Sequence, residues 1–175
     1  MNKNLSVPYK GFALFHITQS WSEGHKAFDI AKPVDSYGTF LVAMENCVVE
    51  NIMTAENWDT GWELERGYGI LLRSIANPEV KYSYWHCAAF FPVKKNDIVL
   101  QGQPIAQMGN SGFVLSNGKP VLMADRLKPP YAGTHCHLSC PKDTIERIDF
   151  NIPIKFDLLT IISLILKQML YFLKK

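Results

Sequence analysis

The sequence lacks several features that mark common classes of protein. Its 18 Lys and Arg residues nearly balance its 16 Asp and Glu residues, and the net charge of +2 includes no basic run that could follow a phosphate backbone. Nucleic acid is therefore not an expected partner. The apolar stretch Phe12–Phe15 ends at His16, well short of the roughly 7–15 apolar residues of a secretory signal. No Sec signal is predicted.

Cysteine is scarce, and familiar catalytic signatures are missing. The four cysteines form no Cys-x-x-Cys pair and are too few to cross-link 175 residues, so we expect them to be reduced. The sequence has no His-Glu-x-x-His, no Gly-x-Ser-x-Gly and no phosphate-binding loop. These absences exclude the helical zincins, the nucleophile-elbow hydrolases and the P-loop nucleotide-binding proteins.

What is present indicates one packed, mainly β domain. Hydrophobic residues make up 47% and charged residues 19% of the chain, as in soluble globular proteins. Short apolar segments rich in Val, Ile and aromatic residues recur between Gly, Pro and Asn, a pattern typical of antiparallel strands. The predicted strand segments are Phe12–Thr18, Ala27–Ala31, Thr39–Glu50, Tyr68–Ile75, Lys81–Phe91, Ile98–Leu100, Pro104–Met108 and Thr134–Ser139.

Two other segments differ from this pattern. Phe113–Gly133 contains a Ser116–Lys119 turn between apolar pairs and is expected to form a hairpin followed by a Pro-rich loop. Phe156–Leu173 carries a narrow polar stripe on an otherwise apolar sequence, which predicts an amphipathic helix. We therefore expect a domain at residues 1–150 and a helical appendage at 151–175. The appendage is a candidate for association with a membrane surface, with copies of itself or with virion subunits, and docking on its own domain is the alternative.

Histidine and aspartate supply the candidate chemistry. His25 and Asp29 lie four residues apart, and His135 and His137 are spaced to share one face of a strand, with Cys136 on the other. Imidazole and carboxylate are ligands that zinc accepts, and three protein ligands plus water make an open catalytic site. Chance spacing and exposed strand histidines are the alternatives. His86 fits a buried histidine equally well, and His16 is expected to be structural.

Several further motifs accompany these residues in a fixed order. They are Ile17-Thr18-Gln19-Ser20, His25-x-x-x-Asp29-Ile30-Ala31, Tyr84-Trp85-His86, Val99-x-x-Gly102-Gln103-Pro104-Ile105, Met108-Gly109-Asn110-Ser111-Gly112 and Gly133-Thr134-His135-Cys136-His137-Leu138. In this order they resemble the lysostaphin-type zinc metallopeptidases, which cut the peptide part of bacterial peptidoglycan. The resemblance implies an antiparallel duplicated-hybrid-motif fold, a β-sandwich or barrel-like peptidase domain.

The resemblance also implies roles for individual residues. His25, Asp29 and His137 correspond to the zinc ligands, while His86 and His135 correspond to the catalytic pair. Tyr84, expected on the same strand face as His86, is a candidate substrate contact, with packing as the alternative.

The sequence departs from the family pattern at two places. Ala27 stands where the family usually has Gly, and Phe113–Gly133 is inserted between motifs that are normally separated by only a few residues. We expect that loop to border the cleft, so the cross-link chemistry of relatives cannot be transferred to this chain.

The sequence thus predicts a Zn²⁺-dependent endopeptidase that acts on bacterial peptidoglycan. A non-enzymatic module of the same fold, which binds cell wall or a partner and holds structural zinc, is the alternative from another class. A third possibility is the same chemistry on a protein substrate. Without a Sec signal, a phage lysin or virion-associated enzyme released by lysis is the expected setting, and a bacterial protein associated with a membrane through its C-terminal helix is the second.

Overall fold

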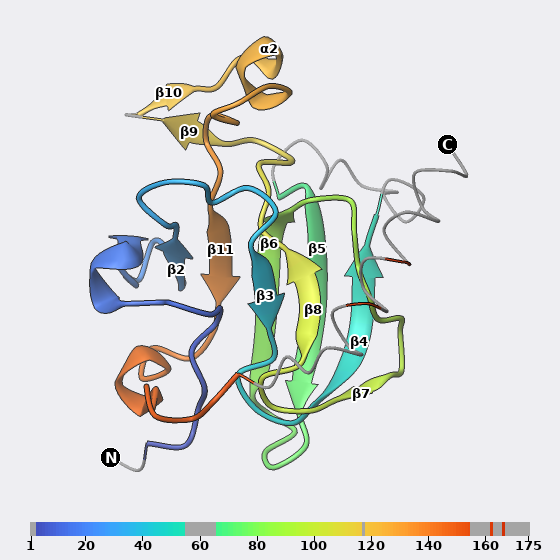
Figure 1. The fold of residues 1–175 in the computed structure, drawn as a ribbon. Coiled ribbons are helices and arrows are strands. Elements are labelled where there is room, and N and C mark those ends of the chain that lie inside the picture. The colour runs from blue at the N-terminus through green and yellow to red at the C-terminus, as the bar shows by residue number, and fades with distance from the viewer. Residues whose placement is uncertain (1–2, 55–65, 117, 155–161, 163–165, 167–175) are drawn as a thin grey trace.

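A seven-stranded antiparallel sheet forms the body of the molecule (Figure 1). The computed structural model describes residues 3–54, 66–116, 118–154, Ile162 and Leu166. The strand order is β1-β2-β11-β6-β5-β4-β7. These strands are β1 Ile17–Gln19, β2 Ala27–Ile30, β4 Cys47–Met53, β5 Tyr68–Ser74, β6 Lys81–Cys87, β7 Ile98–Val99 and β11 Cys136–Ser139.

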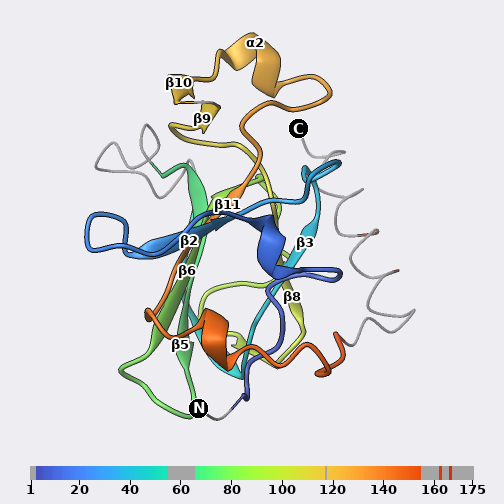
Figure 2. The ribbon, with the colours of Figure 1, turned by 90° about the vertical axis from the view of Figure 1, so that its left-hand side faces the viewer.

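A second, smaller layer covers one face of this sheet. Strands β3 (Phe40–Val42) and β8 (Pro104–Gln107) pair antiparallel and lie in front of β5 and β6, as both ribbon views show (Figures 1 and 2). Because side chains alternate across a strand, one face of the large sheet is apolar and packs against this layer. The largest fully buried side chains of the core include Tyr82, Tyr84, Leu41, Ile70, Leu72, Ile105 and Leu138.

The predicted strand segments are found in the structure with two differences. The segment predicted at Thr39–Glu50 is divided into β3 and β4, which belong to different sheets. The N-terminal part of Phe12–Thr18 is a 3-10 turn, η1 (Leu14–His16), and only its end enters β1. His16 is buried, and its Nδ1 lies 2.8 Å from the hydroxyl of Tyr9. This pairing agrees with a structural role for His16 and explains why alternation breaks there. The four cysteines are all free, as expected.

Residues 113–133, here called the arm, project from one end of the sheet (Figures 1 and 2). The arm contains the predicted hairpin, with β9 (Leu115–Ser116) paired to β10 (Lys119–Pro120), and then the short helix α2 (Met123–Arg126). It returns to the body at Gly133 and leads directly into β11. This connection places the arm next to the His-x-His strand.

The C-terminal region is described only in part. The 3-10 turn η3 (Ile145–Arg147) is followed by the buried Ile148, which bridges to Leu5. The helix predicted at Phe156–Leu173 lies outside the described residues except for Ile162 and Leu166, which are helical and exposed. No helix within the described ranges is both long enough and apolar enough to cross a membrane.

Candidate metal centre

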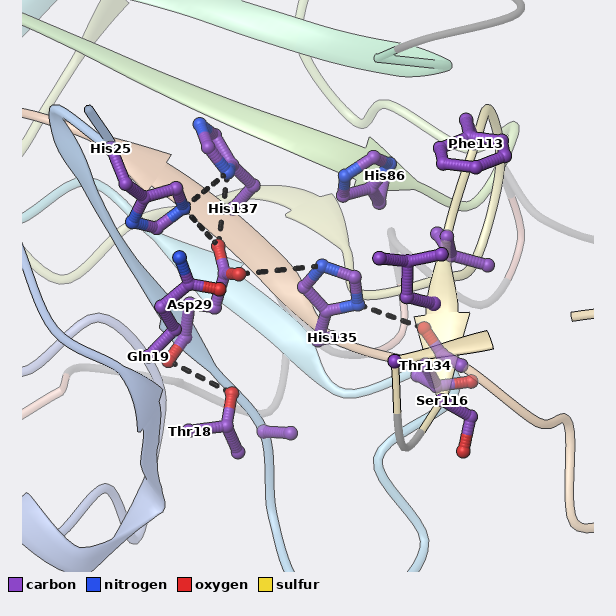
Figure 3. A pocket seen from close by; sticks show the side chains of 15 residues that line it. Thr18, Gln19, His25, Asp29, His86, Phe113, Ser116, Thr134, His135 and His137 are labelled. Carbon is purple, nitrogen blue, oxygen red and sulfur yellow. Dashed lines mark hydrogen bonds and ion pairs between the residues drawn. The ribbon is translucent and has the colours of Figure 1, made fainter. Parts of the chain in front are cut away.

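Strand pairing between β2 and β11 brings three of the predicted site residues together. His137 on β11 lies directly opposite Asp29 on β2. Its neighbours Cys136 and Leu138 are fully buried in the core, so His137 is on the other face of the sheet. His25 comes from the tight turn just before β2, where it bridges to Ser22. Figure 3 shows the three side chains converging on one point.

The three potential ligand atoms form a compact triangle. His25 Nε2 lies 3.2 Å from Asp29 Oδ1 and 3.2 Å from His137 Nδ1, and the third side, from His137 Nδ1 to Asp29 Oδ1, measures 2.9 Å. Ligand bonds of 2.0–2.2 Å in a tetrahedral zinc site place ligand atoms about 3.3–3.6 Å apart. The triangle is therefore close to the size that zinc requires.

Asp29 supplies the electrostatic reason for a cation at this point. Its Oδ1 is buried and has no hydrogen-bond partner among the described residues, although two imidazole nitrogens lie 2.9 and 3.2 Å away. Burial acts to raise the pKa of the Asp29 carboxyl, but the adjacent His137, His135 and His25 outweigh it and lower that pKa below its usual value. An ionised, unsatisfied acceptor between two imidazoles fits a bound metal ion.

The two remaining predicted residues, His86 and His135, lie beside this triangle. Their ring centroids are 4.6 Å apart. Each ring has its Nδ1 2.8 Å from a backbone carbonyl, that of Ser111 for His86 and that of Gly133 for His135. A carbonyl only accepts hydrogen bonds, so Nδ1 carries a proton in both rings and Nε2 is the nitrogen turned away from these carbonyls. His135 Nε2 is 4.0 Å from Asp29 Oδ2.

An irregularity in β6 turns His86 into the site. Simple alternation would place it on the core side with Tyr84, two residues earlier. The pairing of β5 with β6 shifts register between Tyr68 and Ile70, and His86 adopts a left-handed φ of +58°. Strained backbone at a non-glycine residue is typical of functional sites. The Ser111 side chain stabilises this bend, because its Oγ donates to Cys87 O at 2.7 Å and accepts from Tyr68 N at 2.9 Å.

The surroundings of His86 determine its charge. Its side chain is only 7% exposed, and burial together with the charge of His135 lowers its pKa from 6.5 to about 3. His86 is therefore a neutral imidazole at neutral pH. It can accept a proton or a hydrogen bond at Nε2, but it cannot donate one there.

The prediction that Tyr84 contacts substrate is wrong. The residue is fully buried, and its hydroxyl donates to Val42 O at 3.0 Å, within the core between the two layers. The same bulge explains the error, because it separates the faces on which Tyr84 and His86 lie. Packing, the alternative considered for Tyr84, is its role in the structure.

A cavity of about 710 Å³ opens over the site. It is lined by the five predicted metal and catalytic residues, by Thr18 and Gln19 of β1, and by arm residues that include Phe113 and Leu115. The expectation that the arm borders the cleft is therefore confirmed. The replacement of Gly by Ala27 is also accommodated, because this residue lies in the regular strand β2 and is not among the residues with positive φ.

Sequence reasoning missed the residues that hold this arrangement. Ser111 and Gly133 appear in the matched motifs, but the sequence does not show that their carbonyls orient the two histidines. The positions of Phe113 and Leu115 in the cavity wall depend on how the arm folds back, and no local pattern signals that.

Comparison of the whole fold with solved structures yields clear matches. A candidate M23 peptidase from Pseudomonas aeruginosa superposes with a TM-score of 0.53 at 17% identity, covering 79% of this chain. A zinc-containing peptidase from Vibrio cholerae superposes with a TM-score of 0.50 at 20% identity, and the match covers 78% of this chain. The chain has the fold of the lysostaphin-type M23 peptidases. It spans only 45% and 35% of the length of these two proteins.

A further match extends over almost the whole length of another solved chain. A chain of the SpoIIQ–SpoIIIAH pore-forming complex superposes with a TM-score of 0.52 at 15% identity, and the match covers 87% of this chain and 95% of that one. No protein-family model matches the sequence, and no curated protein matches it. The shared fold is thus evident from structure at identities where sequence comparison finds nothing.

Proposed function

We propose that this protein is a zinc-dependent endopeptidase that hydrolyses peptide bonds of bacterial peptidoglycan. One observation carries the proposal. Two imidazole nitrogens and an ionised carboxylate oxygen converge within 3.2 Å of one another, and two further histidines, each held through Nδ1 by a backbone carbonyl, lie beside them. Three protein ligands in an open pocket are typical of catalytic zinc, whereas structural zinc sites normally have four.

The residues present fit a zinc ion, with His25 Nε2, Asp29 Oδ1 and His137 Nδ1 as its ligands. When bound, zinc would polarise a scissile carbonyl and lower the pKa of a coordinated water to about 7. The carboxylate of Asp29 contributes the single negative charge of the ligand set. Its short contacts with His25 and His137 hold the three donors in place before any ion enters.

His86 and His135 would handle the proton in this reaction. The nucleophilic water can donate its hydrogen to Nε2 of His86, because this nitrogen is unprotonated while Nδ1 is fixed on Ser111 O at 2.8 Å. The proton lost by the water is passed through the histidine pair to the leaving amine. The water oxygen ends on the new carboxyl group, and the peptide nitrogen leaves as a free amino group, so the hydrolysis balances.

Peptidoglycan is proposed as the substrate because of the motif resemblance and the peptidase fold. The cavity extends from β1 on one wall to the arm on the other, with the metal ligands in its lining, and a concave site of this kind is where a substrate would bind. The proposed setting is a phage lysin or virion-associated hydrolase that acts on the bacterial cell wall. Association through residues 156–173 is proposed for the C-terminal region.

A non-enzymatic partner-binding module is the second candidate. The match to a chain of a pore-forming complex favours it, because that match extends over 95% of the other chain. Complete retention of the five site residues favours the enzyme. A binding module has no need for two further histidines oriented by backbone carbonyls beside the metal ligands.

Two measurements on the purified protein test the proposal. Elemental analysis should find one zinc per chain, and Asp29→Ala should abolish it. Digestion of purified peptidoglycan should release fragments with new amino termini. A protein that binds zinc in the wild type but releases no fragments from any peptidoglycan would support the binding module instead.

A further inference from the structure

Two apolar side chains of the arm line the cavity close to the catalytic histidines. Phe113 is 51% exposed and Leu115 is 47% exposed, and both line the same cavity as His86 and His135. Figure 3 shows Phe113 at the end of the pocket next to His86, with His25 and Asp29 at the other end. Exposed apolar surface in a concave site is typical of a ligand contact.

The base of the arm is packed firmly enough to keep this wall in position. Val114 and Val121 are buried, and they pack against Gly133, where the arm rejoins the body. Gly133 has a φ of +75°, and a Cβ there would lie 2.7 Å from Val114 Cγ2. A side chain at position 133 would therefore push the hairpin outward. The arm and the His-x-His strand are fitted together at this point.

Two polar side chains anchor the arm to the loop that orients His86. Asn110 donates through Nδ2 to Arg126 O at 3.2 Å and to Ala132 O at 3.1 Å. Arg126 in turn donates through Nε to Val121 O at 3.0 Å and through Nη1 to Gly112 O. Asn110 immediately precedes Ser111, whose carbonyl holds His86 Nδ1. The same loop, residues 110–111, therefore anchors the arm that carries Phe113 and Leu115 and orients His86.

We propose that Phe113 and Leu115 form a specificity subsite for an aliphatic side chain next to the scissile bond. The chemistry favours a cross-link that contains alanine over one built from glycine, because glycine has no side chain to cover the two apolar groups. This inference rests on the proposed peptidase function and deepens it. A difference of one methyl group in an apolar pocket is worth roughly 10-fold or more in kcat/KM.

The test compares two synthetic peptides that differ only at the scissile pair, one alanyl-alanine and one glycyl-glycine. The zinc-loaded wild type should prefer the alanine peptide by about 10-fold in kcat/KM. Phe113→Ala and Leu115→Ala should lower kcat/KM for the alanine peptide to near the glycine value and leave the glycine peptide unchanged. Leu100→Ala is the matched control, because Leu100 is 60% exposed and does not line the cavity.

Other outcomes overturn the subsite. A wild type that prefers the glycine peptide contradicts it, and so do arm variants that slow both peptides equally. If the wild type cleaves neither peptide, the proposed function fails for these substrates, and calorimetry with the zinc-free protein still tests the subsite. Tighter binding of the alanine peptide that is lost in Leu115→Ala but kept in Leu100→Ala supports the subsite, whereas equal binding of both peptides by all variants overturns it.

Discussion

Zinc should stabilise the folded protein through the triangle of His25, Asp29 and His137. The three ligand atoms are 2.9–3.2 Å apart, so each separation has to grow by only about 0.1–0.7 Å to reach the geometry of tetrahedral zinc. The site is thus largely formed before the metal binds. Binding should consequently stabilise the native state without a large rearrangement.

The size of this effect follows from mass action. Free zinc at 100 times its Kd stabilises the folded state by about 2.7 kcal/mol. For a domain of this size, each kcal/mol raises the Tm by about 2–4 °C, so zinc should raise the Tm by about 5–10 °C. Thermal unfolding of the chelator-treated protein, with and without added zinc, measures this shift.

Asp29→Asn is the sharpest variant for this assay, because it keeps the shape of the side chain and removes its charge. Loss of the only anionic ligand is expected to lower zinc affinity at least about 100-fold. The increase in Tm caused by zinc should then fall to about 1–2 °C at the same zinc concentration. Glu50→Gln is the matched control, since Glu50 pairs with Arg73 and Lys81 away from the site. If zinc raised the Tm of Asp29→Asn as much as that of the wild type, the assignment of Asp29 as a ligand would be refuted.

Three further predictions concern catalysis, thiol reactivity and the C-terminal region. His86→Gln should retain zinc by elemental analysis but lose about 10²–10⁴ in turnover, and unchanged turnover would return His86 to a structural role. Burial, aided by the charge of Glu45, raises the pKa of Cys47 from 9.0 to about 12, so Cys47 should resist alkylation in the native protein at pH 8 and react once it is unfolded. Because only the unfolded chain gains thiolate at Cys47 above pH 9, this residue should lower the free energy of unfolding as pH rises from 9 to 12. Deletion of residues 157–175 should leave a folded, zinc-binding domain that no longer associates with liposomes or with itself, and loss of folding would show that the segment belongs to the core.

The strands could be predicted because they follow from local patterns, whereas the set of three metal ligands was implied by the resemblance of the ordered motifs to the lysostaphin-type peptidases. Alternation along β11 places His137 on the opposite face of the sheet from Cys136 and Leu138. Antiparallel pairing of β11 with β2 then brings His137 next to Asp29. Alternation is a short-range property that sequence periodicity records, but the pairing of β2 with β11 joins residues more than 100 positions apart and appears only in the folded chain. The hairpin of the arm was equally visible, because its Ser116–Lys119 turn separates two apolar pairs.

The placement of His86 and Tyr84 depended on a feature that alternation does not record. One register shift between β5 and β6, together with the left-handed backbone of His86, reverses the face expected for that residue. The inward-facing wall of Phe113 and Leu115 depends on long-range anchoring by Asn110 and Arg126. Such contacts join residues that are distant in sequence, so they emerge only in the folded chain.

The most direct test of the central claim is mass analysis of peptidoglycan digested by the zinc-loaded protein. The account predicts fragments whose summed masses exceed the mass of the parent cross-linked material by one water for each cleaved peptide bond, with one new amino terminus per cleavage. It also predicts that His86→Gln, with the same zinc content, yields almost none. Intact peptidoglycan after treatment with zinc-loaded wild-type protein, or equal fragments from His86→Gln, would contradict the account.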